Sequence, residues 1–176
     1  MATTTQTKVS ALFKDQASAD KAFQAALDRG YTQNDLNVAM TEEARQKHYP
    51  EGKGVVVEEG NKAAEGAGVG GGIGGITGGV IAAIAAIGTT LIIPGLNLLV
   101  AGPLAAGLAG AGAGALTGGL VGALVGWGMT EKHAKEYESG LQEGNIAIAV
   151  TTRSEADART IEEDWRACGA ARVDRY

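Results

Sequence analysis

The sequence contains a single cysteine, three prolines and few aromatic side chains, which make up 5% of its 176 residues. With one cysteine, Cys168, the chain can form neither an internal disulfide nor a thiolate metal cluster. Its 28 glycines do not build a collagen triple helix, because that structure needs a Gly-X-Y repeat rich in proline. The 15 basic residues are outnumbered by 20 acidic ones and form no cluster, which argues against a nucleic-acid partner.

Charged residues are missing from one long segment: residues 66–130 contain no Asp, Glu, Lys, Arg or His. We call it the charge-free segment. The residues before and after this segment are polar and mixed in charge. A membrane-spanning helix needs about 20 apolar residues, so a segment of this length has room for two passes. The change in composition divides the chain into residues 1–62, 63–130 and 131–176.

The first part has the pattern of a strand, a helix and a second strand. An apolar run at residues 9–14 predicts the first strand, and Asp15 is placed to cap the helix. Gly30 stands where a helix-ending glycine belongs. The predicted buried face of the helix consists of Ala19, Ala22, Phe23, Ala26 and Leu27, and the second strand of Leu36, Val38 and Met40 with their neighbours.

The last part repeats this plan. Residues 145–151 predict a strand, Ser154 a helix cap, and residues 172–176 a final strand. One apolar stripe marks the helix between them, formed by Ala158, Ile161, Trp165 and Cys168 and followed by Gly169. Two such units are expected to pair as an α+β fold, a ferredoxin-like split βαβ head with four antiparallel strands and two helices on one side.

Because about a hundred residues separate the two halves, the middle must leave the sheet and return to it. Charged helices at residues 41–49 and 131–142 are expected to lead out and back, with a minor strand at residues 55–57. Between them we expect a helical hairpin with its turn near residues 93–103, where the breakers Pro94, Gly95 and Pro103 occur.

Glycine recurs every four residues in both arms of this hairpin, so one face of each predicted helix is a groove without side chains. Such small-xxx-small rows let helices pack closely. We therefore expect helix packing and oligomerisation through Gly66, Gly70, Gly74 and Gly78 in the first arm and Gly102, Gly110, Gly114, Gly118, Gly122 and Gly126 in the second.

Residues 66–79 include nine glycines, each about 1 kcal/mol worse than alanine inside a helix, so this helix must be clamped by neighbours or by a bilayer. A flexible linker is the alternative, but the segment is too rich in isoleucine and valine for one. Three arrangements remain open: a hairpin that dips into a membrane, one that crosses it with a small apolar tip, and hairpins buried in a soluble assembly. Trp127 fits either a lipid headgroup boundary or ordinary packing.

Patterns for chemistry are weak. The segment Gly70-x-Gly72-x-x-Gly75 matches a dinucleotide fingerprint, but no strand directly precedes it and matches are expected by chance in so much glycine. His48 and His133 have no second ligand at metal-binding spacing, and Cys168 lies on the apolar face of its helix. We therefore expect no enzyme, catalytic residue, metal, cofactor or identifiable small-molecule ligand, although a ligand-sensing sheet is a third reading.

Several segments together resemble a bacterial family whose members are labelled general stress, low-temperature-induced or predicted membrane proteins. They are Ile93-Pro94-Gly95, residues 101–106, residues 117–126 and residues 131–144, which end in Tyr-Glu-x-Gly-Leu-x-x-Gly. The resemblance covers almost the whole chain. It implies a bacterial stress protein in the cytoplasm or at a membrane and supplies no catalytic residue.

We therefore expect a non-enzymatic, stress-associated protein that forms a homo-oligomer through its glycine rows. Its head would be cytoplasmic, since the first residues lack a secretion signal, and its hairpins would associate with the lipid bilayer of the inner membrane. The alternative is a soluble cytoplasmic ring, cage or filament with the hairpins inside.

Overall fold

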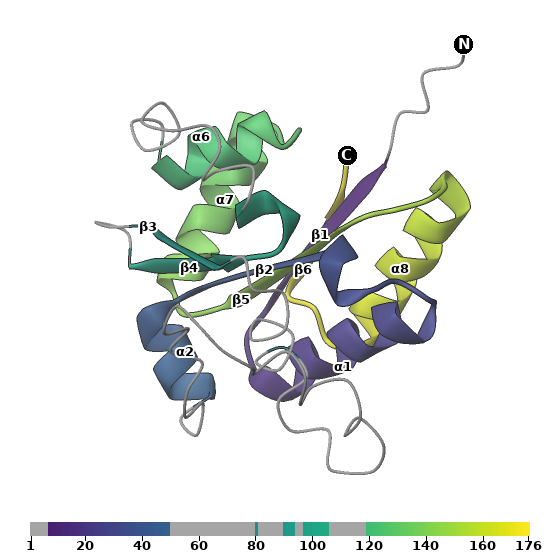
Figure 1. The fold of residues 1–176 in the computed structure, drawn as a ribbon, viewed down its shortest axis with the longest axis horizontal. Coiled ribbons are helices and arrows are strands. Elements are labelled where there is room, and N and C mark those ends of the chain that lie inside the picture. Colours follow the sequence, from purple (N-terminus) through teal and green to yellow (C-terminus); the bar gives the residue numbers. More distant parts are fainter. Residues whose placement is uncertain (1–6, 50–79, 81–89, 94–96, 106–118) are drawn as a thin grey trace, which may run out of the picture.

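The computed structural model describes residues 7–49, 80, 90–93, 97–105 and 119–176. Within these residues the chain is α+β, with one six-stranded antiparallel sheet in the order β3-β4-β2-β5-β1-β6 (Figure 1). The strands are β1 (Lys8–Phe13), β2 (Leu36–Thr41), β3 (Thr90–Ile93), β4 (Leu98–Ala101), β5 (Ile146–Thr151) and β6 (Arg172–Arg175). The helices are α1 (Gln16–Asp28), α2 (Glu42–His48), α6 (Gly119–Gly126), α7 (Glu131–Gln142) and α8 (Glu155–Ala167), with a 3-10 turn at Gln33–Asp35.

The two outer parts of the chain share this sheet, as their patterns predict. β1 lies between β5 and β6, with Ala11 opposite both Ile148 and Val173. The predicted caps are also confirmed: the Asp15 carboxylate accepts from the Ser18 amide at 2.9 Å, and the Ser154 hydroxyl accepts from the Asp157 amide at 3.1 Å. Strand and helix formation in both parts is therefore decided by local sequence.

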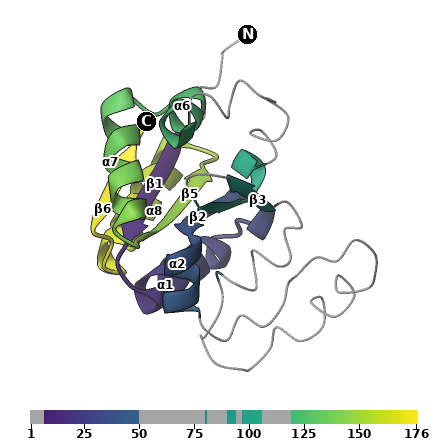
Figure 2. The ribbon, with the colours of Figure 1, turned by 90° about the vertical axis from the view of Figure 1, so that its left-hand side faces the viewer.

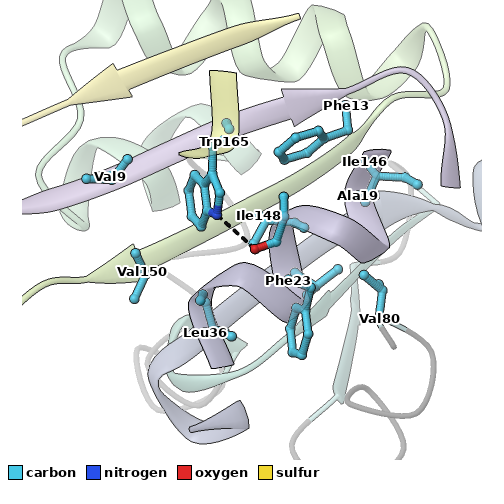
Figure 3. Close-up of a cluster of buried hydrophobic side chains, with 14 of the residues drawn as sticks. Val9, Phe13, Ala19, Phe23, Leu36, Val80, Ile146, Ile148, Val150 and Trp165 are labelled. Atoms are coloured by element: carbon cyan, nitrogen blue, oxygen red, sulfur yellow. Dashed lines mark hydrogen bonds between the residues drawn. The ribbon is translucent and has the colours of Figure 1, made fainter. Parts of the chain in front are cut away.

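One face of the sheet is covered by α1 and α8. Trp165 of α8 is fully buried there, meets Phe13 edge to face and donates its indole N–H to the Ala22 carbonyl oxygen at 2.9 Å (Figure 3). This contact joins the two helices across the sequence. The predicted apolar faces of both helices lie in this core.

The opposite face carries a second core that the sequence did not predict. It lies under α6 and α7, which pack together (Figure 2) on the opposite side of the sheet from α1 and α8 (Figure 1). The residues of β5 that face this layer are Ala147 and Ala149, and its large side chains point to the first core. Alternation of large and small apolar residues, rather than apolar and polar ones, is the signal of a strand covered on both faces.

The middle of the charge-free segment joins the sheet. β3 and β4 pair with each other, and β4 pairs with β2, so that Met40 lies opposite Leu99. The prediction of a turn between two helices is therefore wrong for residues 90–93 and 98–101, which form strands. Their β-branched and leucine side chains favour strands, and they extend the edge left open by β2.

The turn between β3 and β4 lies against the head instead of far from it. Asn97, with a φ of 51°, accepts the Glu42 amide at 2.8 Å and donates its side-chain amide to Glu43 at 2.8 Å. Both partners belong to α2, one of the two charged helices that the sequence predicts; the other is α7. No helix in the described ranges is long and apolar enough to cross a membrane.

Candidate functional site

Only part of the predicted glycine rows can be located. Gly102, Gly122, Gly126 and Pro103 are described, and the other predicted site residues lie outside the described residues: Gly66, Gly70, Gly74, Gly78, Pro94, Gly95, Gly110, Gly114 and Gly118. The same holds for the dinucleotide-like segment at residues 70–75 and the minor strand at residues 55–57.

Helix α6 directs its glycines away from the rest of the described protein. Leu120 and Leu124 are buried against the second core, whereas Gly122 and Gly126 are exposed. Among the residues that the structure describes, a Cβ atom at either glycine would meet nothing within 4 Å outside the helix itself and its chain neighbours. Val125 lies beside them with 41% of its surface exposed. We refer to Gly122, Val125 and Gly126 as the glycine face of α6.

Contacts just after α6 hold it in this orientation. The Lys8 ammonium donates to the Trp127 carbonyl oxygen and lies 5.1 Å from the centroid of the Trp127 ring. That ring meets Tyr176 edge to face at 5.9 Å. Of the two predicted roles of Trp127, the structure therefore shows packing. Contacts with Lys8 of β1 and with Tyr176 thus anchor the residue that directly follows α6.

Gly102 has a different role from the one predicted. Its φ is +105°, and a Cβ there would overlap the Leu36 carbonyl oxygen and lie 3.0 Å from the Asn37 Cα. The residue lets backbone approach backbone closely, but its partner is β2 and not another helix. Pro103 then begins a helical turn, as proline does at a first helical position.

Two buried polar side chains, Asn37 and Asp20, attach the charge-free segment to the head, and sequence reasoning missed both. The Asn37 side-chain oxygen accepts the Leu104 amide at 2.7 Å. Asp20, which is 2% exposed, accepts the Val80 amide at 3.0 Å and the Tyr49 hydroxyl at 3.3 Å. A carboxylate on the apolar face of an amphipathic helix was the available signal for Asp20.

Three hydroxyl groups meet beneath α7, on Ser10, Tyr137 and Tyr176. Burial raises the pKa of both phenols, and the adjacent Ser10 hydroxyl opposes that shift. None of the three oxygens has a hydrogen bond of normal geometry within the described part of the chain. A small cavity lies next to Ser10 and Tyr137, and its other lining residues include Asn37, Leu120 and Met129.

The remaining candidates for chemistry take part in packing. His48 Nε2 lies 3.1 Å from the Gly144 carbonyl oxygen, and His133 Nε2 lies 4.0 Å from Asp174. Cys168 is half-buried at the end of α8, and burial raises the pKa of its thiol. No group of three metal-ligating side chains occurs among the residues that the structure describes.

The glycine face of α6 is thus the described surface that best matches a predicted site. In comparisons with known proteins, no protein-family model, curated protein sequence or solved structure matches this chain.

Proposed function

We propose that this protein is non-enzymatic and self-associates, with the glycine face of α6 forming part of the contact between copies. The observation that carries this proposal is that no described residue lies next to Gly122 and Gly126, on a helix whose opposite side packs in the second core. A groove without side chains lets a second helix approach closely. Val125, beside the groove, supplies apolar area that the contact would bury.

The fold we propose for the head is the ferredoxin-like split βαβ unit, with the charge-free segment inserted between its halves. Support comes from the order β2-β5-β1-β6 within the sheet and from α1 and α8 on one face. In this proposal the strands β3 and β4 are an addition to that unit. A head of this kind holds α6 rigidly, which lowers the conformational entropy lost on association.

We favour an assembly over a hairpin that crosses a membrane. The turn at Asn97 is hydrogen-bonded to α2, so this part of the charge-free segment stays with the head. Association with a membrane surface is the competing function, because the uncharged glycine face of α6 could also contact lipid. The resemblance to general stress proteins adds the proposal that the assembly serves a bacterial stress response.

Sedimentation velocity of the full chain without detergent tests the proposal. We expect a defined oligomer for the wild type and a shift to smaller species for Gly122→Leu, whose side chain would fill the groove. Gly122→Ala is the matched control, since a methyl group keeps the groove shallow. The proposal fails if the wild type is monomeric at every concentration or if the leucine variant assembles normally. Recovery of the wild type only with membranes or in detergent would favour the competing function.

A further inference from the structure

The two edges of the sheet differ in charge. At one edge, β6 carries Arg172, Asp174 and Arg175 among its four residues. At the other edge, the four residues of β3 carry no charge, and Ile92 is 60% exposed. Exposed edge strands offer unpaired amide and carbonyl groups to other strands, and charged side chains are a common protection against such pairing. β6 has this protection and β3 does not.

The geometry of β3 suits pairing with another strand. All four of its residues are in register with β4, from Thr90 opposite Ala101 to Ile93 opposite Leu98. β4 is fixed in turn by β2, and its own side chains are buried. Among the strands that the structure describes, β3 has no partner on its outer edge. Its pairing with β4, and that of β4 with β2, hold it in place, so little conformational freedom would be lost when a second strand binds.

We propose that β3 pairs antiparallel with β3 of a second copy, which joins the two sheets into one across a two-fold axis. The charges favour this partner: β3 against its own copy places no like charges opposite one another, whereas β6 against its own copy would bring arginine toward arginine. The two-fold arrangement is closed, so it ends at a dimer and does not continue as a fibre. This interface is separate from the glycine face of α6 and does not depend on it.

Amide hydrogen exchange of the wild type at several protein concentrations tests the pairing directly. Alternate amides of β3 already bond β4, so the informative amides of residues 90–93 are those that point away from β4. We expect these outward amides to become more protected as the concentration rises, in step with the dimer fraction from sedimentation. Exchange that is slow at every concentration would mean that the edge is covered within one chain, and would overturn the proposal. Exchange that is fast at every concentration would overturn it too.

Two variants separate this interface from the α6 contact. Ile92→Lys should weaken β3-mediated dimerisation by about tenfold or more, since two lysines would face each other across the axis. At a concentration where both proteins are monomeric, its unfolding midpoint should equal that of the wild type, because the side chain is mostly exposed. Ile92→Thr is the uncharged control. Val125→Lys should keep the concentration-dependent protection of residues 90–93 while it disrupts the α6 contact. If Ile92→Lys dimerises like the threonine variant, the β3 proposal fails whatever the outcome for α6.

Discussion

At Gly102 the backbone of the charge-free segment lies directly against β2. A side chain at this position would overlap the Leu36 carbonyl oxygen, and the φ of +105° is one that L-amino acids rarely adopt. Gly122, by contrast, lies inside a helix, and a Cβ added there would meet no other described residue within 4 Å. These two glycines belong to the same row in the sequence, yet their surroundings differ completely.

Replacing each by alanine should therefore have opposite effects. Gly102→Ala adds steric overlap and backbone strain, each of which costs about 1–3 kcal/mol, so its free energy of unfolding should fall by several kcal/mol. Gly122→Ala should raise the free energy of unfolding by up to about 1 kcal/mol, because alanine is the better helix former. Urea denaturation of both variants measures this difference. Equal destabilisation would mean that the space at Gly122 is filled.

Tyr137 offers a test of the hydroxyl cluster by pH. Burial raises the pKa of its phenol above the ordinary value of about 10, so the folded state favours the neutral form. The stability of the folded state that depends on a neutral Tyr137 is therefore present in full below pH 10. It is lost as the pH rises above 10. Tyr137→Phe should accordingly make the protein less sensitive to unfolding above pH 10, which circular dichroism across an alkaline titration can follow.

At pH 7 the same substitution removes a buried hydroxyl that has no hydrogen bond of normal geometry to any described residue. The free energy of unfolding should then be unchanged or higher by about 1 kcal/mol. A loss of more than about 1 kcal/mol would contradict this expectation and would mean that the hydroxyl has a well-formed partner.

Residue roles set by near neighbours were predictable, and those set by distant ones were not. Asp15, Ser154, Gly30 and Gly169 act within one helical turn of their own positions, and the structure confirms all four. Asn37 bonds to an amide 67 residues away. No local pattern encodes such a distance, because it depends on how the sheet brings β2 and residue 104 together.

The helices and strands show the same contrast: those set by local sequence were predicted, and those set by distant parts of the chain were not. Strands and helices of the outer parts follow from apolar spacing and caps, and so do the charged helices α2 and α7. The strands β3 and β4 were missed because glycine spacing on both sides of them indicated helices throughout the segment. The layer formed by α6 and α7 was missed because the alanines of β5 were not recognised as a second buried face.

A substitution at Asn37 tests whether its side chain holds the helical turn that begins at Pro103. Asn37→Ala leaves the Leu104 amide without its acceptor in a buried place, which should cost about 1–3 kcal/mol. Amide exchange at Leu104 should accelerate in this variant. As a control, Ser154→Ala removes the cap of α8 and should cost about 1 kcal/mol without a change at Leu104. Unchanged exchange at Leu104 in Asn37→Ala would refute the role of Asn37.

On the scale of the whole molecule, one sheet serves two cores. β1 sends Phe13 into the first and Leu12 into the second, and β2 and β5 are divided in the same way. Neither layer of helices can separate without exposing one face of the same strands. The described residues should therefore unfold as one cooperative unit.

The two tryptophans make this expectation measurable, since Trp165 lies in the first core and Trp127 packs against the second. Fluorescence of Trp127→Phe reports on the first core, and fluorescence of Trp165→Phe reports on the second. For each variant, the fluorescence midpoint in urea should coincide with its midpoint by circular dichroism. If the fluorescence of Trp127, measured in Trp165→Phe, changes at a lower urea concentration than the circular dichroism of that variant, the layer of α6 and α7 unfolds as a separate unit.

The position of β1 between β5 and β6 also has a consequence for synthesis on the ribosome. Both of its hydrogen-bonded neighbours lie far along the chain, at residues 146–175, whereas β2 can pair with β4 before they are made. The apolar β1 therefore has neither of these partners until the ribosome has added more than 130 further residues. Pairing between such distant segments is slow, and unpaired apolar strands are prone to aggregate. We therefore expect this topology to make the nascent chain a chaperone substrate during translation.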